Sequence, residues 1–343
     1  MAWRPLRLGA DAPYRSLVGV GGVGRGIFFD LEGGHDLGRN ESRPGRLLPV
    51  RDYCKLHIIA HYPAVLLEAG PPGSAFRVVP IARVGDDEAG RDLRREMEGV
   101  GMDCRFVLPA PGRPTLQSVC FQYPDGSGGN ITTSDSAAET LTTADVDAAA
   151  DLIDRSTIVL AAPEAPLAAR VHLLRLGTER GALRAAAFTS AEAAEARRLS
   201  LFAHADIVAF NEDEAQALTG IRYDPDDARP LLGACASTLG AESPGVRILF
   251  TAGANGAYGF DGASWKHCPA LPVSVASTAG AGDALLAGVL TALAAGAPFA
   301  EALEFGALLA AYKVTSPHTI HPDAGLDRLV AFASEQGKEL HAL

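Results

Sequence analysis

The chain has 343 residues, 48% of them hydrophobic, and a formal net charge of −11 at pH 7. This length and composition are enough to bury a full core in one large domain or two ordinary ones. The acidic balance, with Lys and Arg scattered, argues against nucleic acid or an anionic membrane as the main partner. A small-molecule partner is the expectation that remains.

The cysteines and the N-terminus indicate the compartment. Five cysteines are widely spaced without a C-x-x-C pair, a pattern that favours neither a disulfide framework nor a zinc knuckle. The N-terminal segment carries positive charge but lacks the apolar stretch of a signal peptide, and no run reaches the roughly 18 apolar residues of a membrane span. We therefore expect a cytoplasmic protein.

The first motif along the chain is GVGGVGRG, in which Gly19, Gly21 and Gly24 match the dinucleotide fingerprint G-x-G-x-x-G. That fingerprint needs a helix to follow, because the helix N-terminus meets the phosphates. Here the chain continues as IFFDLEGGHDLGRN, whose glycines break a helix. We therefore predict a first strand whose glycines allow close backbone approach, and we keep a nicotinamide-dependent oxidoreductase as a distant alternative.

Strands and helices alternate over the middle of the chain. Short apolar runs predict strands, and amphipathic stretches between them predict helices. The strands are expected at 76–85, 156–162, 183–188 and 206–210, and the helices at 88–101, 142–155 and 165–181. Two further apolar segments and the turn YPDGSGGN predict a small antiparallel unit near 104–134. The alternation predicts a mostly parallel sheet covered by helices on both faces, in a single domain over 1–343.

The stretch STAGAGDALLAGVL at 277–290 combines a glycine-rich turn with the start of an apolar helix. Gly280, Ala281 and Gly282 can expose backbone N–H groups there, and the helix dipole also favours a bound anion such as phosphate. Asp283 at the same helix start is either a simple helix cap or a reactive carboxylate. The neighbouring glycines favour the anion site, because a plain cap does not need them.

This stretch is similar to the signature D-T-x-G-A-G-D of the ribokinase-like sugar kinases, the phosphofructokinase B type family. Other segments resemble that family in the family's own order: RVGDDEAG at 83–90, ITTSDSA at 131–137, PEAPL at 163–167, FNEDEAQALTG at 210–220 and TAGANGAYGF at 251–260. The resemblance covers residues 76–318. It implies an α/β fold, a ribokinase-like three-layer sandwich with a mostly parallel central sheet and a small β lid, and it suggests a homodimer through that lid.

The resemblance implies an ATP-dependent kinase that phosphorylates a hydroxyl of a sugar, nucleoside or related polyol. Asp283 would accept the proton of that hydroxyl, while the N–H groups of Gly280, Ala281 and Gly282 would stabilise the transferring phosphoryl group. The ATP contacts implied are Asn211, Thr251, Gly253, Asn255 and Gly256, and the Mg²⁺ residues are Asn211 and Glu214. From the residues alone, a helix cap explains Asn211 and Glu214 equally well, and a hairpin turn explains TAGANG.

The N-terminal region near 19–64 departs from the family. Gly26 falls near the position of a family aspartate, and LHIIAHYPA replaces a Gly-Gly-x-x-x-Asn grip, with His61 near its asparagine. Five basic residues concentrate there instead: Arg39, Arg43, Arg46, Arg51 and Lys55. They form either a solvated face or a pocket for an anionic or strongly polar substrate. The residues predicted to bind the substrate that accepts the phosphoryl group are Glu164, His61, Arg39 and Lys55.

Two further consequences of these departures stay open at this point. Ser277 stands where the family commonly has an aspartate that helps bind a monovalent cation in some members, so potassium activation is in doubt. The altered N-terminal region also leaves a catalytically inactive, ligand-binding member of the same fold as an alternative. The intact GAGD sequence argues against that alternative.

Overall fold

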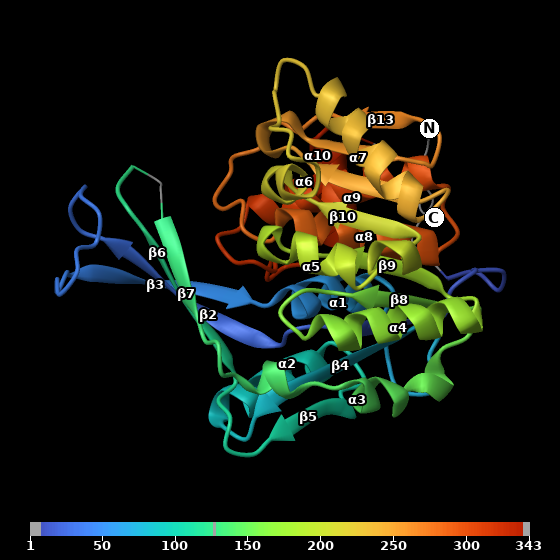
Figure 1. The fold of residues 1–343 in the computed structure, drawn as a ribbon, viewed down its shortest axis with the longest axis horizontal. Coiled ribbons are helices and arrows are strands. Elements are labelled where there is room, and N and C mark those ends of the chain that lie inside the picture. Colours follow the sequence, from blue (N-terminus) through green and yellow to red (C-terminus); the bar gives the residue numbers. More distant parts are fainter. Residues whose placement is uncertain (1–7, 126–127, 339–343) are drawn as a thin grey trace.

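The computed structural model describes residues 8–125 and 128–338. Within them, the strands form a nine-stranded sheet and a four-stranded sheet, the lid, which projects from one side of the molecule (Figure 1). In spatial order, the nine strands are β13 (Trp265–Cys268), β12 (Ala257–Phe260), β11 (Arg247–Thr251), β10 (Ile207–Phe210), β9 (Leu183–Ala187), β8 (Thr157–Ala161), β1 (Ser16–Val20), β4 (Arg77–Gly85) and β5 (Phe106–Ala110).

The large sheet is parallel from β11 to β5, and β12 and β13 add an antiparallel hairpin at one edge. Its central strands are apolar on both faces, which is why β1, β8 and β10 are almost entirely buried. β1 pairs with both β4 and β8, so successive connections diverge on its two sides. Ligands in such sheets bind beyond the carboxyl ends of the strands at this point of divergence.

Helices cover both faces of the large sheet, so the predicted three-layer α/β sandwich is confirmed. Each face has its own cluster of buried apolar side chains. One face carries α1 (Lys55–Leu66), α2 (Glu88–Gly99), α8 (Ala281–Ala294), α9 (Phe299–Val314) and α10 (Leu326–Glu335); the other carries α3 (Thr143–Asp147), α4 (Leu167–Arg180), α5 (Ala193–Arg198), α6 (Glu212–Thr219) and α7 (Arg229–Glu242). No helix in the described part of the chain is long and apolar enough to span a membrane.

The helix predicted at 142–155 is shorter than expected. α3 ends at Asp147 and is followed by the 3₁₀ turn Ala150–Leu152. Thr142 caps it as predicted, through a reciprocal capping box with Asp145.

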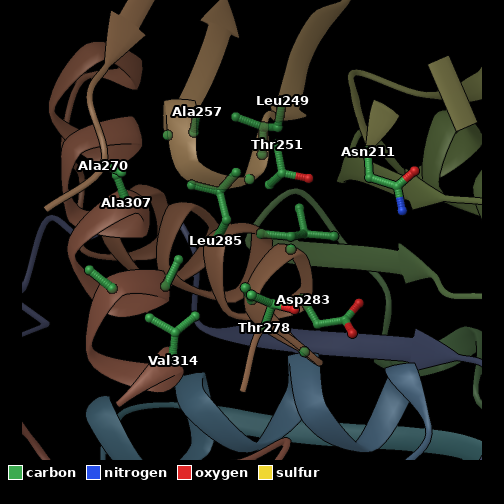
Figure 2. A pocket seen from close by; sticks show the side chains of 18 of the residues that line it. Asn211, Leu249, Thr251, Ala257, Ala270, Thr278, Asp283, Leu285, Ala307 and Val314 are labelled. Atoms are coloured by element: carbon green, nitrogen blue, oxygen red, sulfur yellow. The ribbon is translucent and has the colours of Figure 1, made fainter. Parts of the chain in front are cut away.

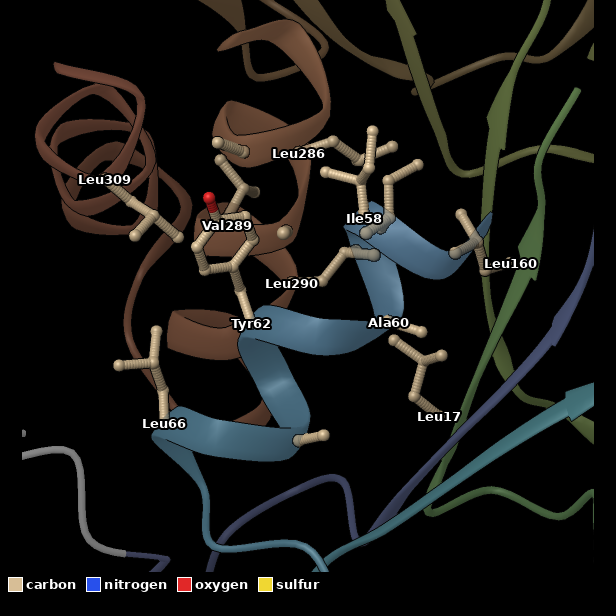
Figure 3. Close-up of a cluster of buried hydrophobic side chains, with 14 of the residues drawn as sticks. Leu17, Ile58, Ala60, Tyr62, Leu66, Leu160, Leu286, Val289, Leu290 and Leu309 are labelled. Carbon is tan, nitrogen blue, oxygen red and sulfur yellow. The ribbon is translucent and has the colours of Figure 1, made fainter. Parts of the chain in front are cut away.

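Helices α1 and α8 pack directly against each other in the core. Figure 3 shows Ile58 and Tyr62 of α1 facing Leu286, Val289 and Leu290 of α8. Burying an aliphatic or aromatic side chain contributes about 1.5–3 kcal/mol. This packing fixes the start of α1 relative to the start of α8, where the residues of the site described below lie.

The lid differs from the unit predicted near 104–134. It consists of β3 (Gly45–Tyr53), β2 (Gly24–Leu31), β6 (Leu116–Gln122) and β7 (Gly128–Thr132), in that order. Half of it therefore comes from the N-terminal region, which the sequence did not assign to the lid. Conversely, β5 pairs with β4 and belongs to the large sheet. A sequence pattern reveals a strand but not the strand with which it pairs, and this is why the predicted extent of the lid was wrong.

The two faces of the lid differ in polarity. Ile27, Val119 and Ile131 are register partners across β2, β6 and β7, and all three are exposed. Leu47 of β3 stands on the same face, opposite Phe29. Contiguous exposed apolar side chains often mark interaction sites. The homodimer that the family resemblance suggests stays a prediction.

The GVGGVGRG motif forms close backbone contacts, as predicted, and no helix follows it. The chain passes from β1 directly into β2. A Cβ atom on Gly19 or Gly21 would lie 2.6–2.7 Å from the side chain of Leu56 in α1. The glycines therefore allow α1 to approach β1, and the helix N-terminus that a dinucleotide site requires is absent from this turn.

We predict that Gly24→Ala lowers the free energy of unfolding by roughly 1–3 kcal/mol, the usual cost of overpacking. The added Cβ would lie 2.4 Å from the carbonyl oxygen of Leu116 in the neighbouring strand β6. Denaturant unfolding measures the change, and Gly233→Ala, where nothing lies within 4 Å, is the matched control. Unchanged stability of Gly24→Ala, or micromolar NAD binding by the wild-type protein, would contradict this assignment.

Candidate active site

The glycine turn predicted to bind an anion lies at the start of α8. Gly280 precedes the helix in the left-handed conformation, with φ of 79°, and a Cβ atom there would lie 2.7 Å from the carbonyl oxygen of Thr319. Both facts require glycine. No side chain caps the first turn of α8. The N–H of Ala281 donates to the carbonyl oxygen of Thr278 at 3.1 Å, whereas the N–H groups of Gly280 and Gly282 have no acceptor among the described residues and remain available to a ligand.

Asp283 is not the helix cap, because Gly280 holds that position and no side-chain capping bond is made. The cap alternative raised from the sequence is therefore wrong. The Asp283 carboxylate instead lies 3.7 Å from Nζ of Lys55, the first residue of α1, and its side chain is 11% exposed. This proximity raises the pKa of the Lys55 ammonium. A cation thus stands beside the carboxylate at the helix start.

Glu164 joins the same site from the loop after β8. Its Oε2 accepts a hydrogen bond of 2.9 Å from the backbone N–H of Lys55, and its own backbone has φ of 65°. Burial raises the pKa of Glu164, and the charge of Lys55 acts in the opposite direction. A Cβ atom on Gly22 would lie 2.5 Å from Cβ of Glu164, so the glycine after β1 makes room for it. The structure brings together three predicted residues: Lys55, Glu164 and Asp283.

A cavity of about 730 Å³ extends from Asp283 across the carboxyl ends of the strands. Figure 2 shows Asp283 and Asn211 toward one end and Ala270, Ala307 and Val314 toward the other. One end is thus polar and the other apolar. The volume and this division suit a ligand that has a charged part and a planar apolar part.

The loop TAGANG forms one wall of this cavity. Thr251, Gly253 and Gly256 line it, but Asn255 does not. The amide of Asn255 donates a hydrogen bond of 3.0 Å to the hydroxyl of Tyr223. The loop also connects β11 to β12 as a hairpin, so the turn predicted there forms, and three of the residues predicted to contact ATP line the cavity from it.

Asn211 and Glu214 form a reciprocal capping box at the start of α6. Oδ1 of Asn211 accepts from the N–H of Glu214 at 3.0 Å, and Oε2 of Glu214 accepts from the N–H of Asn211 at 2.9 Å. Both also line the cavity. Within residues 8–125 and 128–338, no three His, Cys, Asp or Glu side chains are grouped closely enough to hold a metal ion. Oε1 of Glu214 is not used by the cap and fits a water-mediated metal contact.

The predicted basic pocket does not form as one cluster. Arg39 lies in the loop between β2 and β3, at the end of the lid where Leu31 pairs with Gly45. The opposite end of the lid is where Arg25 pairs with Tyr53. The two ends are six residues apart along β2, which corresponds to roughly 20 Å. Only Lys55 lies in the cavity. Arg43 and Arg46 instead bind Glu41 and Asp30 within the lid.

His61 is partly buried in the second turn of α1 and does not line the cavity. Burial lowers its pKa to about 4, and it packs at 6.1 Å from the ring of His57. His61 was predicted to bind the acceptor because the sequence did not reveal that α1 starts at Lys55, six residues earlier.

Two charged residues near the site were missed in the sequence. Asp52 lies at the end of lid strand β3, and the negative charge of Asp283 helps to raise its pKa. Lys313 of α9 is fully buried and donates a hydrogen bond of 3.0 Å to the carbonyl oxygen of Ser277, at the base of the glycine turn. Lys313 lies in an apolar helix without a motif, and Asp52 is recognisable only once β3 is paired with β2.

A family model describing the pfkB family carbohydrate kinases matches residues 67–324. The chain belongs to this family. It is 29% identical over 271 residues to 2-dehydro-3-deoxygluconokinase of Thermoproteus tenax, covering 74% of this chain and 78% of that protein. It is 25% identical over 243 residues to deoxyribokinase of Salmonella typhi, covering 71% and 77%. This kinase is therefore a phosphotransferase with an alcohol group as acceptor, and sugars are the family's substrate class.

Solved structures show that the kinase shares the ribokinase-like fold. Arabidopsis thaliana ribokinase, complexed with ribose and ATP, superposes with a TM-score of 0.73 and 17% identity, over 93% of this chain and 98% of that one. Ribokinase of Thermotoga maritima gives a TM-score of 0.73 and 19% identity, over 94% and 100%. The predicted family and fold class are both confirmed.

Proposed function

We propose that this carbohydrate kinase transfers the γ-phosphoryl group of ATP to a hydroxyl of a sugar, nucleoside or related polyol, with Asp283 as the general base. The observation that carries the proposal is the position of Asp283. Its carboxylate stands in the first turn of α8 beside uncapped N–H groups, at the polar end of the cavity. A base and an anion site must adjoin in this way for phosphoryl transfer.

The proposed orientation of ATP follows from the polar and apolar ends of the cavity. Its phosphates would meet the N–H groups of Gly280, Ala281 and Gly282, where the helix dipole favours negative charge. The loop from Thr251 to Gly256 would contact the nucleotide, with Gly253 and Gly256 at the surface of the cavity and Asn255 acting through Tyr223. ATP is also the ligand named for Arabidopsis ribokinase.

Mg²⁺ would be held near Asn211 and Glu214 through water, since this ion retains much of its hydration shell. A putative ribokinase II of E. coli has been solved with ATP and Mg²⁺, with a TM-score of 0.73 to this chain. The ion would neutralise phosphate charge. The protein side chains would orient it, and the buried carboxylate of Glu214 is one of the acidic groups that line the cavity beside Asn211.

The acceptor would bind between Asp283, Lys55 and Glu164. The carboxylate of Glu164 can accept hydrogen bonds from hydroxyl groups, and the ammonium of Lys55 can hold negative charge that develops next to Asp283. Arg39 lies at the far end of the lid, and neither His61 nor Glu164 is part of the cavity lining. We base the acceptor site on Lys55 and Glu164, because the carboxylate of Glu164 is hydrogen-bonded to the backbone N–H of Lys55.

We predict that Lys55→Met lowers kcat/KM by about 10- to 100-fold, the usual effect of losing a charged hydrogen-bonding group. Arg39→Ala serves as the matched removal of a basic residue from the same region of sequence, and it should leave kcat/KM within twofold. Steady-state kinetics with the best acceptor found in a panel of sugars and nucleosides measure both. The reverse ranking of the two variants would show that the lid tip, not Lys55, recognises the substrate.

We predict that Asp283→Asn lowers turnover by about 10² to 10⁴, the usual contribution of a positioned general base. Asn has nearly the same shape but does not accept a proton at neutral pH. Because Asp283 makes no capping bond, α8 should keep its fold, and loss of the Lys55 ion pair should lower the melting temperature only modestly, with little change in ATP affinity. Acceptor-dependent ADP release, thermal melting and ATP titration measure the three quantities on both proteins.

Equal turnover of Asp283→Asn and wild type would require the proposed mechanism to be abandoned. The same assay addresses the alternative of a catalytically inactive, ligand-binding member of the fold. That alternative predicts ATP or acceptor binding without ADP release by the wild-type protein. The uncapped glycine turn beside Asp283 argues against it, since a binding protein would not need a carboxylate there.

A further inference from the structure

Asp52 lies at the base of the lid, on the face of the sheet opposite to the exposed apolar residues. It pairs with Gly26 of β2, which in turn pairs with Ser118 of β6, and Ser118 pairs with Thr132 of β7. Directly opposed residues in a sheet place their side chains on the same face. The lid thus presents a polar row of one carboxylate and two hydroxyls, with a glycine between them.

The Asp52 carboxyl group occupies the space above Gly26. A Cβ atom on Gly26 would lie 1.9 Å from Oδ2 of Asp52, so any other residue at 26 would displace the carboxylate. The pairing of β2 and β3 is irregular between Gly26 and Phe28, directly beside this pair. Bulges of this kind re-aim a side chain next to a functional site. The local backbone is therefore shaped to hold Asp52 in this position.

The segment that follows α9 anchors Asp52 on the catalytic side. The N–H of Thr319 donates to the carbonyl oxygen of Arg51 at 3.1 Å, and the N–H of Tyr53 donates to Oγ1 of Thr319 at 3.0 Å. Thr319 also lies against Gly280, the residue that begins the glycine turn. The backbone on both sides of Asp52 is thereby bound to Thr319, the residue that lies against the turn proposed to hold the phosphoryl group.

The carboxylate of Asp52 has no ion-pair partner among the residues that the structure describes. Its oxygen lies 4.0 Å from Sγ of Cys120, and the buried Lys313 is directed to Ser277. Burial raises the pKa of Asp52 to about 6, with Asp283 acting in the same direction, so the group is mainly ionised at pH 7.5. Thr319 and the backbone N–H of Tyr53 act on this carboxylate as neutral hydrogen-bond donors and lower its pKa, but neither supplies a counter-charge. The lone pairs that remain can accept hydrogen bonds from a ligand, which would offset the cost of burying the charge.

We propose that Asp52 is an acceptor-binding residue, which receives hydrogen bonds from hydroxyl groups adjacent to the one that Asp283 deprotonates. A carboxylate offers acceptors only, so it recognises O–H donors such as a vicinal diol. It also repels a carboxylate or phosphate at the same place on the ligand. The lid side of the site therefore selects a neutral, hydroxyl-rich acceptor over an acidic one. This inference rests on the proposed function.

The test compares wild type, Asp52→Asn and a matched control, Asp30→Asn, which removes a carboxylate nearer the tip of the same lid. An aldose panel, the corresponding aldonates and nucleosides serve as acceptors. For the best neutral acceptor, Asp52→Asn should raise both the calorimetric Kd and KM by about 10- to 100-fold, the loss expected for a charged hydrogen bond. Because Asp52 does not touch the reacting oxygen, kcat should change less than about threefold, and ATP affinity should not change.

The ratio of kcat/KM for an aldose to that for its aldonate should also fall in Asp52→Asn, because the repulsion is removed. Asp52→Ser, which lacks the charge but keeps a hydroxyl, is measured in parallel, and the conclusion rests on whichever variant melts close to wild type. A Kd and KM within twofold of wild type, or an equal effect of Asp30→Asn, would overturn the inference.

Failure of the proposed function gives a different result. Wild type would then bind a polyol without phosphorylating it, and the Kd comparison alone would decide the role of Asp52. If wild type bound no hydroxyl compound at millimolar concentration, the inference would be overturned together with the acceptor site.

Discussion

The packing of α1 against α8 is the constraint on which the site depends. Both helices begin at the carboxyl edge of the parallel sheet, and their buried side chains interlock over several turns (Figure 3). This holds Lys55 and Asp283, the residues at their first turns, 3.7 Å apart at closest approach. Close-packed interiors transmit such constraints because they have little free volume. The small residues Gly19 and Gly21 allow α1 to lie close enough to β1 for this packing.

A second constraint links the lid to the catalytic turn. The segment after α9 contacts both, since Thr319 binds the backbone of β3 and lies against Gly280. Lys313, from the end of α9, holds the carbonyl of Ser277 at the base of the same turn. The lid base and the glycine turn therefore share one support. This segment positions the residues proposed to bind the acceptor relative to those proposed to hold the phosphoryl group.

The sequence predicted the parts of the molecule that depend on local pattern. Alternating strands and helices were recognised between residues 76 and 210 because each carries its own periodicity. The glycine turn before Asp283 was recognisable because Gly280 adopts a left-handed conformation that favours glycine. The lid was only half predicted, since pairing of β2 with β3 and β6 is a long-range property. Arg39 and Lys55 appeared related because they are near in sequence, but a strand of the lid separates them. Asp52 stood unnoticed in the segment VRDYCKLH for the same reason.

In the proposed reaction, the γ-phosphoryl group leaves ATP and becomes attached to a hydroxyl oxygen of the acceptor. The direct measurement is phosphorus-31 NMR of the purified wild-type protein with ATP, Mg²⁺ and a panel of sugars, nucleosides and polyols. We predict that ADP forms together with an equal amount of a phosphomonoester of one acceptor class. Release of inorganic phosphate alone, or no consumption of ATP with any hydroxyl compound, would contradict it.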